Sequence, residues 1–266
     1  MLTVFDSHFH IIDSKFPLVS NHSYLPPLFT TKDYLMKTKH LNIVGGAIVS
    51  GSFQAFDQTY LLAALRKLGP SFVGVTQLPD SVPDKELIRY HTAGVRAIRF
   101  NFKRGGSEGV KNLESFAKRV HEVVGWHVEL YVDSNDLFDL SPTLLRLLAV
   151  SIDHLGLSQK GLPELLVLVE KGVKVKATGF GRVDFDVASA LKKIASINPD
   201  ALMFGTDLPS TRAPRPFSDG DIQIVRDIFD DDLLNKIFYL NAVSFYKPKE
   251  SLFSPGLSSS KNLDQP

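Results

Sequence analysis

The sequence predicts a (β/α)8 TIM barrel of parallel strands, formed by a single domain over residues 1–247. Two observations predict this fold. Short apolar segments typical of strands alternate with helical segments, and the alternation gives about eight strand–helix units, the number that closes a barrel. A doubly wound open sheet is the alternative. It is disfavoured because no P-loop or G-x-G-x-x-G motif follows a predicted strand, and Gly105-Gly106 lacks a third glycine.

The predicted elements follow one another with few irregularities. The first strand takes up residues 3–12, and a helix that Thr31 can cap extends towards Leu41. Residues 43–49 form a short apolar run, as in a strand buried on both faces. Leucines at helical spacing then predict a helix over residues 58–68. The later strands are expected at residues 71–78, 94–101, 128–132, 149–154, 173–178 and 201–206, and the later helices at residues 83–90, 109–124, 142–148, 162–170, 184–197, 219–229 and 231–246.

Two segments fall outside the regular alternation. Residues 13–29 form a long loop with proline and aromatic residues, and loops longer than about 12 residues in compact domains are usually functional or disordered. The aromatic content favours a packed functional loop. Residues 248–266 are rich in Ser, Pro, Gly and Lys, a composition typical of a mobile C-terminal tail.

The composition excludes several functional classes. The chain carries 30 basic and 29 acidic side chains, so its net charge of +1 gives no overall field that attracts nucleic acid or an anionic membrane. The absence of cysteine excludes disulfides, thiolate metal sites and a cysteine nucleophile. No stretch approaches the ~18 apolar residues of a membrane span, and no signal-peptide pattern opens the chain. We therefore expect a cytoplasmic protein without membrane or nucleic-acid partners, and the sequence is compatible with a homo-oligomer.

The first strand contains two histidines in an unusual setting. Because side chains alternate between the two faces of a strand, Asp6, His8 and His10 are expected on one face, with Phe5 and Phe9 on the other. Burying a polar group without a partner costs roughly 2–7 kcal/mol, so such a face indicates a function or a polar network. A chance H-x-H is the alternative.

Other ionisable side chains lie at the ends of later strands. The carboxyl ends of the strands form the reactive face of a (β/α)8 barrel, so these side chains are expected to meet the two histidines there. That face would carry, in chain order, His8, His10, Ser52, Arg99, Arg104, Tyr131, His154, Arg182 and Asp207. Singly, each has a structural alternative, such as a core histidine or a solvated arginine. As a set, they predict an active site. His127 opens its strand and is expected in an interior polar layer with Glu129.

Five motifs occur in a characteristic order: DSHFH at residues 6–10, RAIRFN at 96–101, IDHLG at 152–156, GTDLP at 205–209 and NAVSFY at 241–246. Together they resemble the amidohydrolase superfamily. The best match is its amidohydrolase-related branch (amidohydrolase 2), which includes 2-pyrone-4,6-dicarboxylate lactonase and other lactonases. The resemblance covers most of residues 1–247 and implies a hydrolase of lactones or carboxylic esters. The R-x-x-R-F-N motif is the main indication of the branch.

The resemblance leaves two alternatives for a metal. Metal-dependent members of the superfamily bind zinc through the H-x-H pair and the eighth-strand aspartate, here His8, His10 and Asp207, with His154 nearby. This chain departs from their pattern, because neither Lys nor Glu ends the fourth strand and Tyr131 stands where a fifth-strand histidine is expected. The lactonase that it resembles works without metal. We therefore expect no cofactor, with a single Zn²⁺ or other divalent metal as the alternative.

The resemblance also implies a mechanism. Asp207 is expected to be the general base that takes a proton from water, while His8, His10 and His154 polarise the ester carbonyl and stabilise the oxyanion. The substrate is expected to be a small molecule with carboxylates, because guanidinium groups pair bidentately with them. The expected substrate-binding residues are Arg99, Arg104, Tyr131, Arg182, Ser52 and Tyr24.

Two other functions stay open at this point. One is a mononuclear zinc-dependent amidohydrolase or decarboxylase acting on a ring acid, and the other is a non-catalytic barrel that binds a small anion. The hydrolytic proposal requires Asp207 to share a water molecule with the first-strand imidazoles. A separation above about 10 Å would exclude it.

Overall fold

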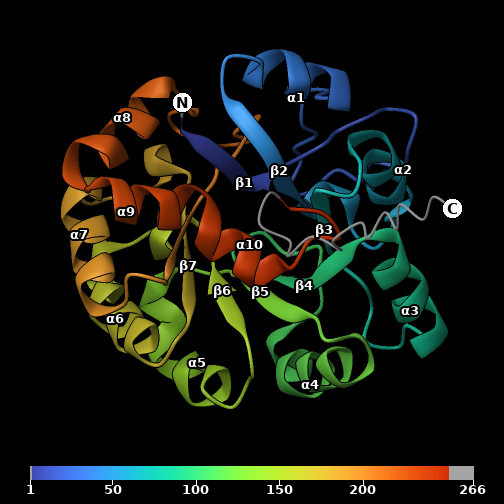
Figure 1. The fold of residues 1–266 in the computed structure, drawn as a ribbon. Coiled ribbons are helices and arrows are strands. Elements are labelled where there is room, and N and C mark those ends of the chain that lie inside the picture. The colour runs from blue at the N-terminus through green and yellow to red at the C-terminus, as the bar shows by residue number, and fades with distance from the viewer. Residues whose placement is uncertain (1, 252–266) are drawn as a thin grey trace, which may run out of the picture.

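Eight parallel strands form the centre of the structure, a computed structural model that describes residues 2–251. The strands pair in chain order from β1 to β8, and each of these pairs is parallel. They lie side by side around a ring that helices enclose (Figure 1). The strands are β1 (Thr3–Phe9), β2 (Asn42–Val49), β3 (Phe72–Thr76), β4 (Val95–Asn101), β5 (His127–Tyr131), β6 (Val150–Ile152), β7 (Lys174–Ala177) and β8 (Leu202–Phe204).

Helices α1 to α8 lie outside this ring (Figure 1). The α-helices of residues 2–251 are α1 (Thr31–Thr38), α2 (Thr59–Leu68), α3 (Asp84–Ala93), α4 (Leu113–Val124), α5 (Leu137–Leu144), α6 (Leu162–Glu170), α7 (Val187–Ile197), α8 (Asp219–Ile228), α9 (Asp231–Asn235) and α10 (Asn241–Tyr246). The sequence explains where a helix begins and ends, as α4 illustrates. Helix α4 buries Leu113, Phe116 and Val120, which share one helix face, and it ends at Gly125, whose φ of 69° suits a left-handed cap.

The first and last strands meet and nearly close the barrel. The backbone N–H of Asp207 donates to the carbonyl oxygen of His8 at 2.7 Å, and that of His10 donates to the carbonyl oxygen of Leu208 at 2.7 Å. These bonds join the carboxyl ends of β1 and β8, which are far apart in the sequence. The predicted (β/α)8 barrel is therefore confirmed.

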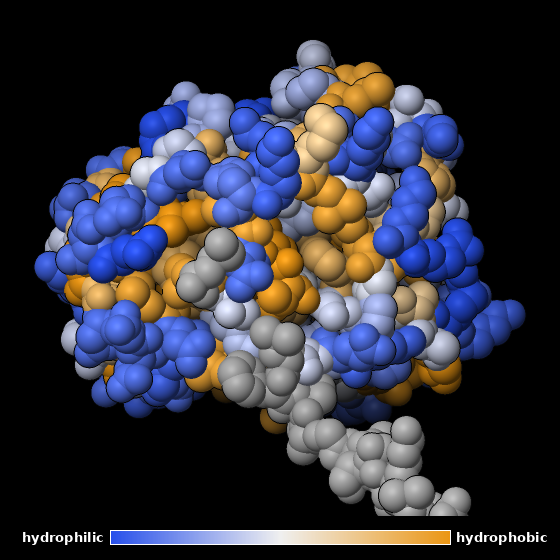
Figure 2. Space-filling model, turned by 45° about the horizontal axis from the view of Figure 1, so that its top comes forward, coloured by the Kyte–Doolittle hydropathy of each residue, from blue (hydrophilic) through white to orange (hydrophobic). Residues whose placement is uncertain are grey.

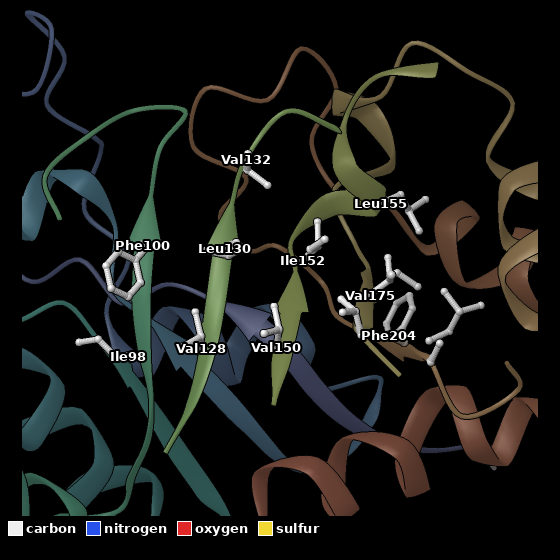
Figure 3. Close-up of a cluster of buried hydrophobic side chains, with 14 of the residues drawn as sticks. Ile98, Phe100, Val128, Leu130, Val132, Val150, Ile152, Leu155, Val175 and Phe204 are labelled. Carbon is white, nitrogen blue, oxygen red and sulfur yellow. The ribbon is translucent and has the colours of Figure 1, made fainter. Parts of the chain in front are cut away.

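Two apolar layers hold the barrel together. The outer layer lies between strands and helices, and Figure 3 shows part of it, with Phe100, Leu130 and Ile152 on neighbouring strands. Phe100 packs against Phe116 of α4, with ring centroids 6.3 Å apart. The inner layer fills the ring near the amino ends of the strands and is closed by α10, which crosses that end of the ring in Figure 1. Its members include Phe5, Val49, Val75, Ala97, Met203 and Tyr246.

The expected alternation fails within β1. The pairing with β2 shifts between Asp6 and Phe9, where β1 contains one residue more than β2. As a result, Asp6 does not share a face with His8. Its carboxylate accepts hydrogen bonds from the Tyr34 hydroxyl of α1 at 3.0 Å and the Thr206 hydroxyl at 2.7 Å. Phe9 stacks on Tyr34, so Asp6 and Phe9 both face the outer layer.

Two helices also differ from the prediction. A helix was expected over residues 142–148, but α5 runs from Leu137 to Leu144 and contains Pro142. The single helix expected over residues 231–246 is α9, a π-helical turn at Lys236–Leu240 and α10. Most of the expected tail, residues 252–266, lies outside the described residues.

Polar side chains cover much of the surface. On the face in Figure 2, hydrophilic residues lie around most of the edge and hydrophobic residues gather towards the middle. Within residues 2–251, no helix has both the length and the apolar composition needed to cross a membrane.

Candidate active site

A cavity of about 390 Å³, its open mouth included, lies at the carboxyl ends of the strands. All six residues expected to bind substrate line it: Tyr24, Ser52, Arg99, Arg104, Tyr131 and Arg182. His10 and His154 also line it, together with Gly51 and Asn101, which end the second and fourth strands as the sequence predicts. Phe53, Thr211 and Arg212, which were not expected there, complete the lining. The structure therefore gathers residues from most of the strand ends around one small chamber.

Asp207 lies among the three histidines at this end of the barrel. Its Oδ1 atom is 4.0 Å from His8 Nε2, 4.0 Å from His10 Nε2 and 3.9 Å from His154 Nε2. These distances exceed the ~2.7–3.2 Å of a direct hydrogen bond, and Asp207 Oδ1 and His8 Nε2 have no hydrogen-bond partner in the described part of the chain. Four converging polar atoms are thus available to a bound group. The condition set by the sequence, a separation below about 10 Å, is met.

The backbone at two of these residues is in the left-handed region. The φ angles are 58° at Asp207 and 52° at His154, a conformation that costs an L-residue about 1–2 kcal/mol. Such outliers persist where the surroundings determine them, and they cluster at active sites. For Asp207, the bond from its N–H to His8 joins β8 to β1. For His154, Gly179 provides the room, because a Cβ atom there would lie 2.5 Å from His154 Nδ1.

Hydrogen bonds give the two first-strand imidazoles opposite roles. His10 Nδ1 lies 2.7 Å from the carbonyl oxygen of Val49, which can only accept, so Nδ1 carries the proton and Nε2 presents a lone pair. His8 Nδ1 lies 3.3 Å from Lys176 Nζ, and an ammonium only donates, so His8 Nε2 carries the proton. Asp153 Oδ1 also lies 3.4 Å from this nitrogen, but Lys176 Nζ is nearer, and we therefore assign the proton of His8 to Nε2.

The three imidazoles are uncharged at neutral pH. Burial lowers the pKa of His8, and the attraction of Asp153 offsets this only in part. Burial, and then the repulsion that a protonated His8 would exert, holds the pKa of His10 well below its usual value. Burial and the nearby Arg182 do the same for His154.

A buried ion network that was not predicted lies below the imidazoles. Lys176 is fully buried, with its Nζ 2.5 Å from Glu129 Oε2 and 3.5 Å from Asp153 Oδ1. Burial favours the neutral form of Glu129, yet Lys176 and a hydrogen bond with His127 keep its pKa below the usual value. The separation of 3.4 Å between His127 Nε2 and Glu129 Oε1 confirms the expected interior polar layer. Lys176 therefore connects that layer to His8.

The sequence contains a signal for Lys176 that was not used. Val175 and Ala177 belong to the outer apolar layer, so alternation places Lys176 inside the ring. Asp153, part of the sixth-strand motif, belongs to the same network. Burial by itself would raise the pKa of Asp153. The positive charges near it outweigh burial and hold the pKa well below the usual value; they come from protonated His8 first, and then from Lys176 and Arg99.

The four arginines of the cavity form two groups. Arg99 Nη2 donates to Asp153 Oδ2 at 2.7 Å, and Arg182 Nε donates to Asp207 Oδ2 at 2.7 Å. Both were expected to bind substrate carboxylates, yet each already binds a carboxylate of the protein. Arg104 and Arg212 make no ion pair with an acid within residues 2–251. Arg212 was missed because it lies in an irregular loop, where no periodic pattern indicates which way a side chain points.

The donor set can accommodate one divalent cation. His8, His154 and Asp207 each offer a buried ligand atom, and these atoms lie within 4.8 Å of one another. Catalytic zinc sites typically have three protein ligands and one open position. Asp207 Oδ1, which has no partner within residues 2–251, suits that pattern, whereas His8 Nε2 would have to lose its proton before it could bind the ion. The sequence predicted His8, His10 and Asp207 as the metal ligands. In the structure His154, and not His10, forms the group of clustered ligand atoms with His8 and Asp207. The cations Arg182 and Lys176, next to Asp207 and His8, oppose a second positive charge.

Solved structures share this fold. The putative 2-pyrone-4,6-dicarboxylic acid hydrolase of Pseudomonas putida is 27% identical, with a TM-score of 0.79 over 93% of this chain and 98% of that protein. A probable 2-pyrone-4,6-dicarboxylic acid hydrolase of Acinetobacter baumannii, solved with citric acid bound, is 20% identical, with a TM-score of 0.79 over 92% of this chain and 99% of that one. At that lower identity, the likeness extends to the fold alone.

Curated relatives and a family model agree with the motifs. A 2-pyrone-4,6-dicarboxylate hydrolase of Comamonas testosteroni is 30% identical over 156 residues, which are 57% of this chain and about half (51%) of that protein. A 4-sulfomuconolactone hydrolase of Hydrogenophaga intermedia is 26% identical over 239 residues, 82% of this chain and 79% of that one. The amidohydrolase family model matches residues 5–247 of the 266. As its motifs predict, this chain therefore belongs to the amidohydrolase family of hydrolases.

Proposed function

We propose that this protein opens the ring of a lactone or related cyclic ester of a small carboxylic acid, with a water molecule that Asp207 activates. The observation that carries the proposal is the position of Asp207 Oδ1, which is buried, lacks a hydrogen-bond partner among residues 2–251 and lies 3.9–4.0 Å from three imidazole nitrogens. The names of the curated relatives, two of them hydrolases of 2-pyrone-4,6-dicarboxylate and 4-sulfomuconolactone, support the choice of a lactone.

Asp207 and His10 together orient the attacking water. Arg182 occupies Asp207 Oδ2, so Oδ1 is the oxygen that accepts a proton. Neutral His10 presents the lone pair of Nε2 on the same side, 4.0 Å from Oδ1. A water molecule between them donates one hydrogen to each, which turns its oxygen towards the substrate and fixes the direction of attack. This role for His10 differs from the carbonyl-polarising role inferred from the sequence.

His8 and His154 act on the ester carbonyl. The Nε2–H of His8 points into the site and donates to the carbonyl oxygen, a bond that strengthens as the oxyanion forms. His154 lies beside His8, with ring centroids 4.8 Å apart, and acts on the same oxygen. The water oxygen bonds to the carbonyl carbon while Asp207 takes the proton. Collapse of the oxyanion breaks the ring C–O bond, and Asp207 returns the proton to the leaving oxygen.

The charge of the cavity limits the substrate. Two arginines at this site have no acidic partner within residues 2–251, so an anionic substrate is favoured over a neutral one. We therefore place a carboxylate or a similar acid group on the substrate ring.

A zinc-dependent amidohydrolase or decarboxylase is the second candidate, favoured by the three clustered ligand atoms of His8, His154 and Asp207. These residues would hold the ion, and it would supply Lewis-acid polarisation and a more acidic water. The ion pair of Arg182 with Asp207 favours the metal-independent reaction, because a cation already neutralises that carboxylate. Metal analysis of protein purified without chelator separates the two.

The decisive experiment compares Asp207→Asn with the wild-type enzyme on carboxylated lactones, including 2-pyrone-4,6-dicarboxylate. Asparagine keeps the shape but cannot accept the proton, so kcat should fall by about 10²–10⁴-fold. Asp139→Asn, at an exposed position of α5, is the matched control and should retain full activity. Unchanged turnover in Asp207→Asn would refute the role of Asp207 as base. A wild-type enzyme that binds these lactones without opening them would support the non-catalytic anion-binding barrel instead.

A further inference from the structure

A second cavity lies at the opposite end of the barrel from the active site, and the proposed reaction does not use it. It opens at the amino ends of β4 and β5, beside the last turns of α3 and α4 and beside α10, which crosses that end of the ring in Figure 1. We propose that this amino-end cavity binds a small oxyanion that also carries an O–H group. The proposal does not rest on the lactone hydrolysis.

Most of the polar lining of the amino-end cavity consists of cations and imidazoles. These residues are Arg96, Lys247, His91, His121 and His127, and no acidic residue of the described part of the chain lines the cavity. Arg96 opens the RAIRFN motif and α10 carries the NAVSFY motif, and the proposed reaction uses neither Arg96 nor α10. An excess of positive charge in a cavity favours an anionic ligand.

Arg96 is fixed between the ends of two helices. Its Nη1 donates to the carbonyl oxygen of His91 in α3 at 2.9 Å, and its Nε donates to that of Lys247, directly after α10, at 3.2 Å. Its Nη2 makes no hydrogen bond within residues 2–251 and is left for a ligand. The partial negative charge of the two helix ends offsets part of the charge of Arg96. The ammonium of Lys247, which has no acidic partner among the same residues, adds a charge that is not offset in this way.

Hydrogen bonds indicate which imidazole nitrogens are free. The indole N–H of Trp126 donates to His91 Nδ1 at 3.3 Å, so the hydrogen of neutral His91 is on Nε2. His127 Nε2 lies 3.4 Å from a carboxylate oxygen of Glu129 and carries the hydrogen, so its Nδ1 presents a lone pair. His121 Nδ1 donates to the carbonyl oxygen of Trp126 at 3.2 Å, which leaves a lone pair on Nε2. Burial lowers the pKa of both His91 and His127, so both are neutral at pH 7.

The buried histidine of this set has an unsatisfied nitrogen. His127 is only 5% exposed and lines the amino-end cavity, and its Nδ1 has no hydrogen-bond partner within residues 2–251. Phe245 of α10 packs on the same ring, with centroids 4.0 Å apart, and holds it in place. Because buried polar atoms are nearly always hydrogen-bonded, this lone pair indicates that a ligand supplies the missing donor.

The cavity therefore offers hydrogen-bond donors and acceptors together. The donors are the ammonium of Lys247, Arg96 Nη2 and His91 Nε2–H, and the acceptors are the lone pairs of His121 and His127. An oxyanion without a hydrogen satisfies the donors but sets its own lone pairs against those of the imidazoles. Hydrogen phosphate and hydroxycarboxylates carry an O–H as well as a negative charge, so they can pair with both kinds of group.

A metal ion fits the amino-end cavity less well, although three histidines line it. Within residues 2–251, the group whose ligand atoms cluster closely enough for an ion is His8, His154 and Asp207, at the other end of the barrel. The cations Arg96 and Lys247 would also repel an additional positive charge. An anion is therefore the better match.

Trp126 is the only tryptophan of the chain, and its indole N–H can report on this cavity. The side chain is buried and donates to His91 Nδ1. An anion that accepts from His91 Nε2–H makes Nδ1 a stronger acceptor, so the indole proton resonance should move downfield as the anion is added. Trp126 does not line the active-site cavity, so acids bound there should leave this resonance unchanged.

Titrations of the full chain at pH 7, followed by NMR of the Trp126 indole N–H, test the proposal. Phosphate is compared with sulfate, and malate with succinate. Within each pair the two anions are similar in shape, and only the first carries an O–H. The Kd should be at least about tenfold lower for the first member of one pair, and the pair with the lower Kd identifies phosphate or a hydroxycarboxylate as the favoured ligand. The proposal is overturned if none of the four anions gives a saturable shift, or if the members of both pairs bind equally.

Variants assign the effect to the cavity. Lys247→Gln removes a cation and should raise the Kd of both anions of the favoured pair about tenfold or more, whereas Lys193→Gln, at an exposed position of α7, should change neither. His127→Phe removes a lone pair, so it should weaken only the anion with the O–H and reduce the preference within the pair. His121→Leu should act in the same direction and serves if His127→Phe does not fold. Wild-type affinity in Lys247→Gln, or an unchanged preference in the folded histidine variants, contradicts the proposal.

Discussion

Replacing Lys176 by methionine tests how much the buried ion network contributes to stability. The Nζ of Lys176 is fully buried, 2.5 Å from Glu129 Oε2 and 3.5 Å from Asp153 Oδ1. Removing one partner of a buried ion pair leaves an uncompensated charge and costs about 3–5 kcal/mol. Asp153 keeps Arg99, and Glu129 keeps the hydroxyl of Tyr246. Methionine also fills most of the space of the lysine stem. We therefore expect the lower end of the range, a loss of about 3 kcal/mol.

The measurement is the free energy of unfolding in urea at pH 7 for the wild type, Lys176→Met, Glu129→Gln and the double variant. In the double variant no charge of the Lys176–Glu129 pair is left alone, so it should be more stable than Lys176→Met by at least about 1 kcal/mol. Lys192→Met, at an exposed position of α7, is the control and should change stability by less than about 0.5 kcal/mol. A loss below about 1 kcal/mol in Lys176→Met, or strict additivity in the double variant, would show that the reasoning is wrong.

Three further predictions concern charge and metal. Asp207→Asn leaves Arg182 without its carboxylate and should therefore be less stable than the wild type, but the variant that is still folded should lose about 10²–10⁴-fold in kcat. A wild-type kcat in the folded variant would contradict a catalytic role. Because the folded-state pKa values of His8, His10 and His154 are lowered, the unfolded chain binds more protons below pH 6.5, so the free energy of unfolding should fall between pH 7 and pH 5. Burial raises the pKa of Asp6 to about 6, so this one carboxyl group makes the folded state more stable as the pH falls. The three histidines should outweigh it. Greater stability at pH 5 than at pH 7 would refute this prediction. Dialysis against a chelator should leave lactone hydrolysis intact, whereas loss of activity that zinc restores would favour the metal-dependent alternative.

The sequence was sufficient for the fold and for most of the cavity because both depend on simple periodicity. Alternating strands and helices gave the barrel, and the barrel determined that strand ends meet at one face. His154 and Asp207 could therefore be placed beside His8 although they are distant in the chain. The sequence did not reveal which groups are already paired. Only coordinates show that Arg99 and Arg182 hold carboxylates of the protein, and this changes which arginines are free for a substrate.

Irregular backbone accounts for most of what the sequence could not predict. Arg212 lies in a loop with positive φ at Asp207, Ser210 and Arg212, and no repeating pattern indicates the direction of a side chain there. The limits of α5 are a similar case. Proline is favoured in the first turn, but the apolar residues Leu137, Leu140 and Leu144 place the helix earlier, because burial of one helix face contributes more than a preference for a terminal position.

The extra residue in β1 explains how one strand serves both the core and the site. In a regular strand with Phe5 inside the ring, positions of the opposite parity, His8 and His10 among them, would face the helices. In the structure Phe5 stacks on Tyr246 of α10 inside the ring, with centroids 5.6 Å apart, and His8 and His10 also face inwards. The shift in pairing between Asp6 and Phe9 makes this arrangement consistent. An apolar layer near the amino ends of the strands and a polar layer at their carboxyl ends can therefore share one strand, because the parity changes between them.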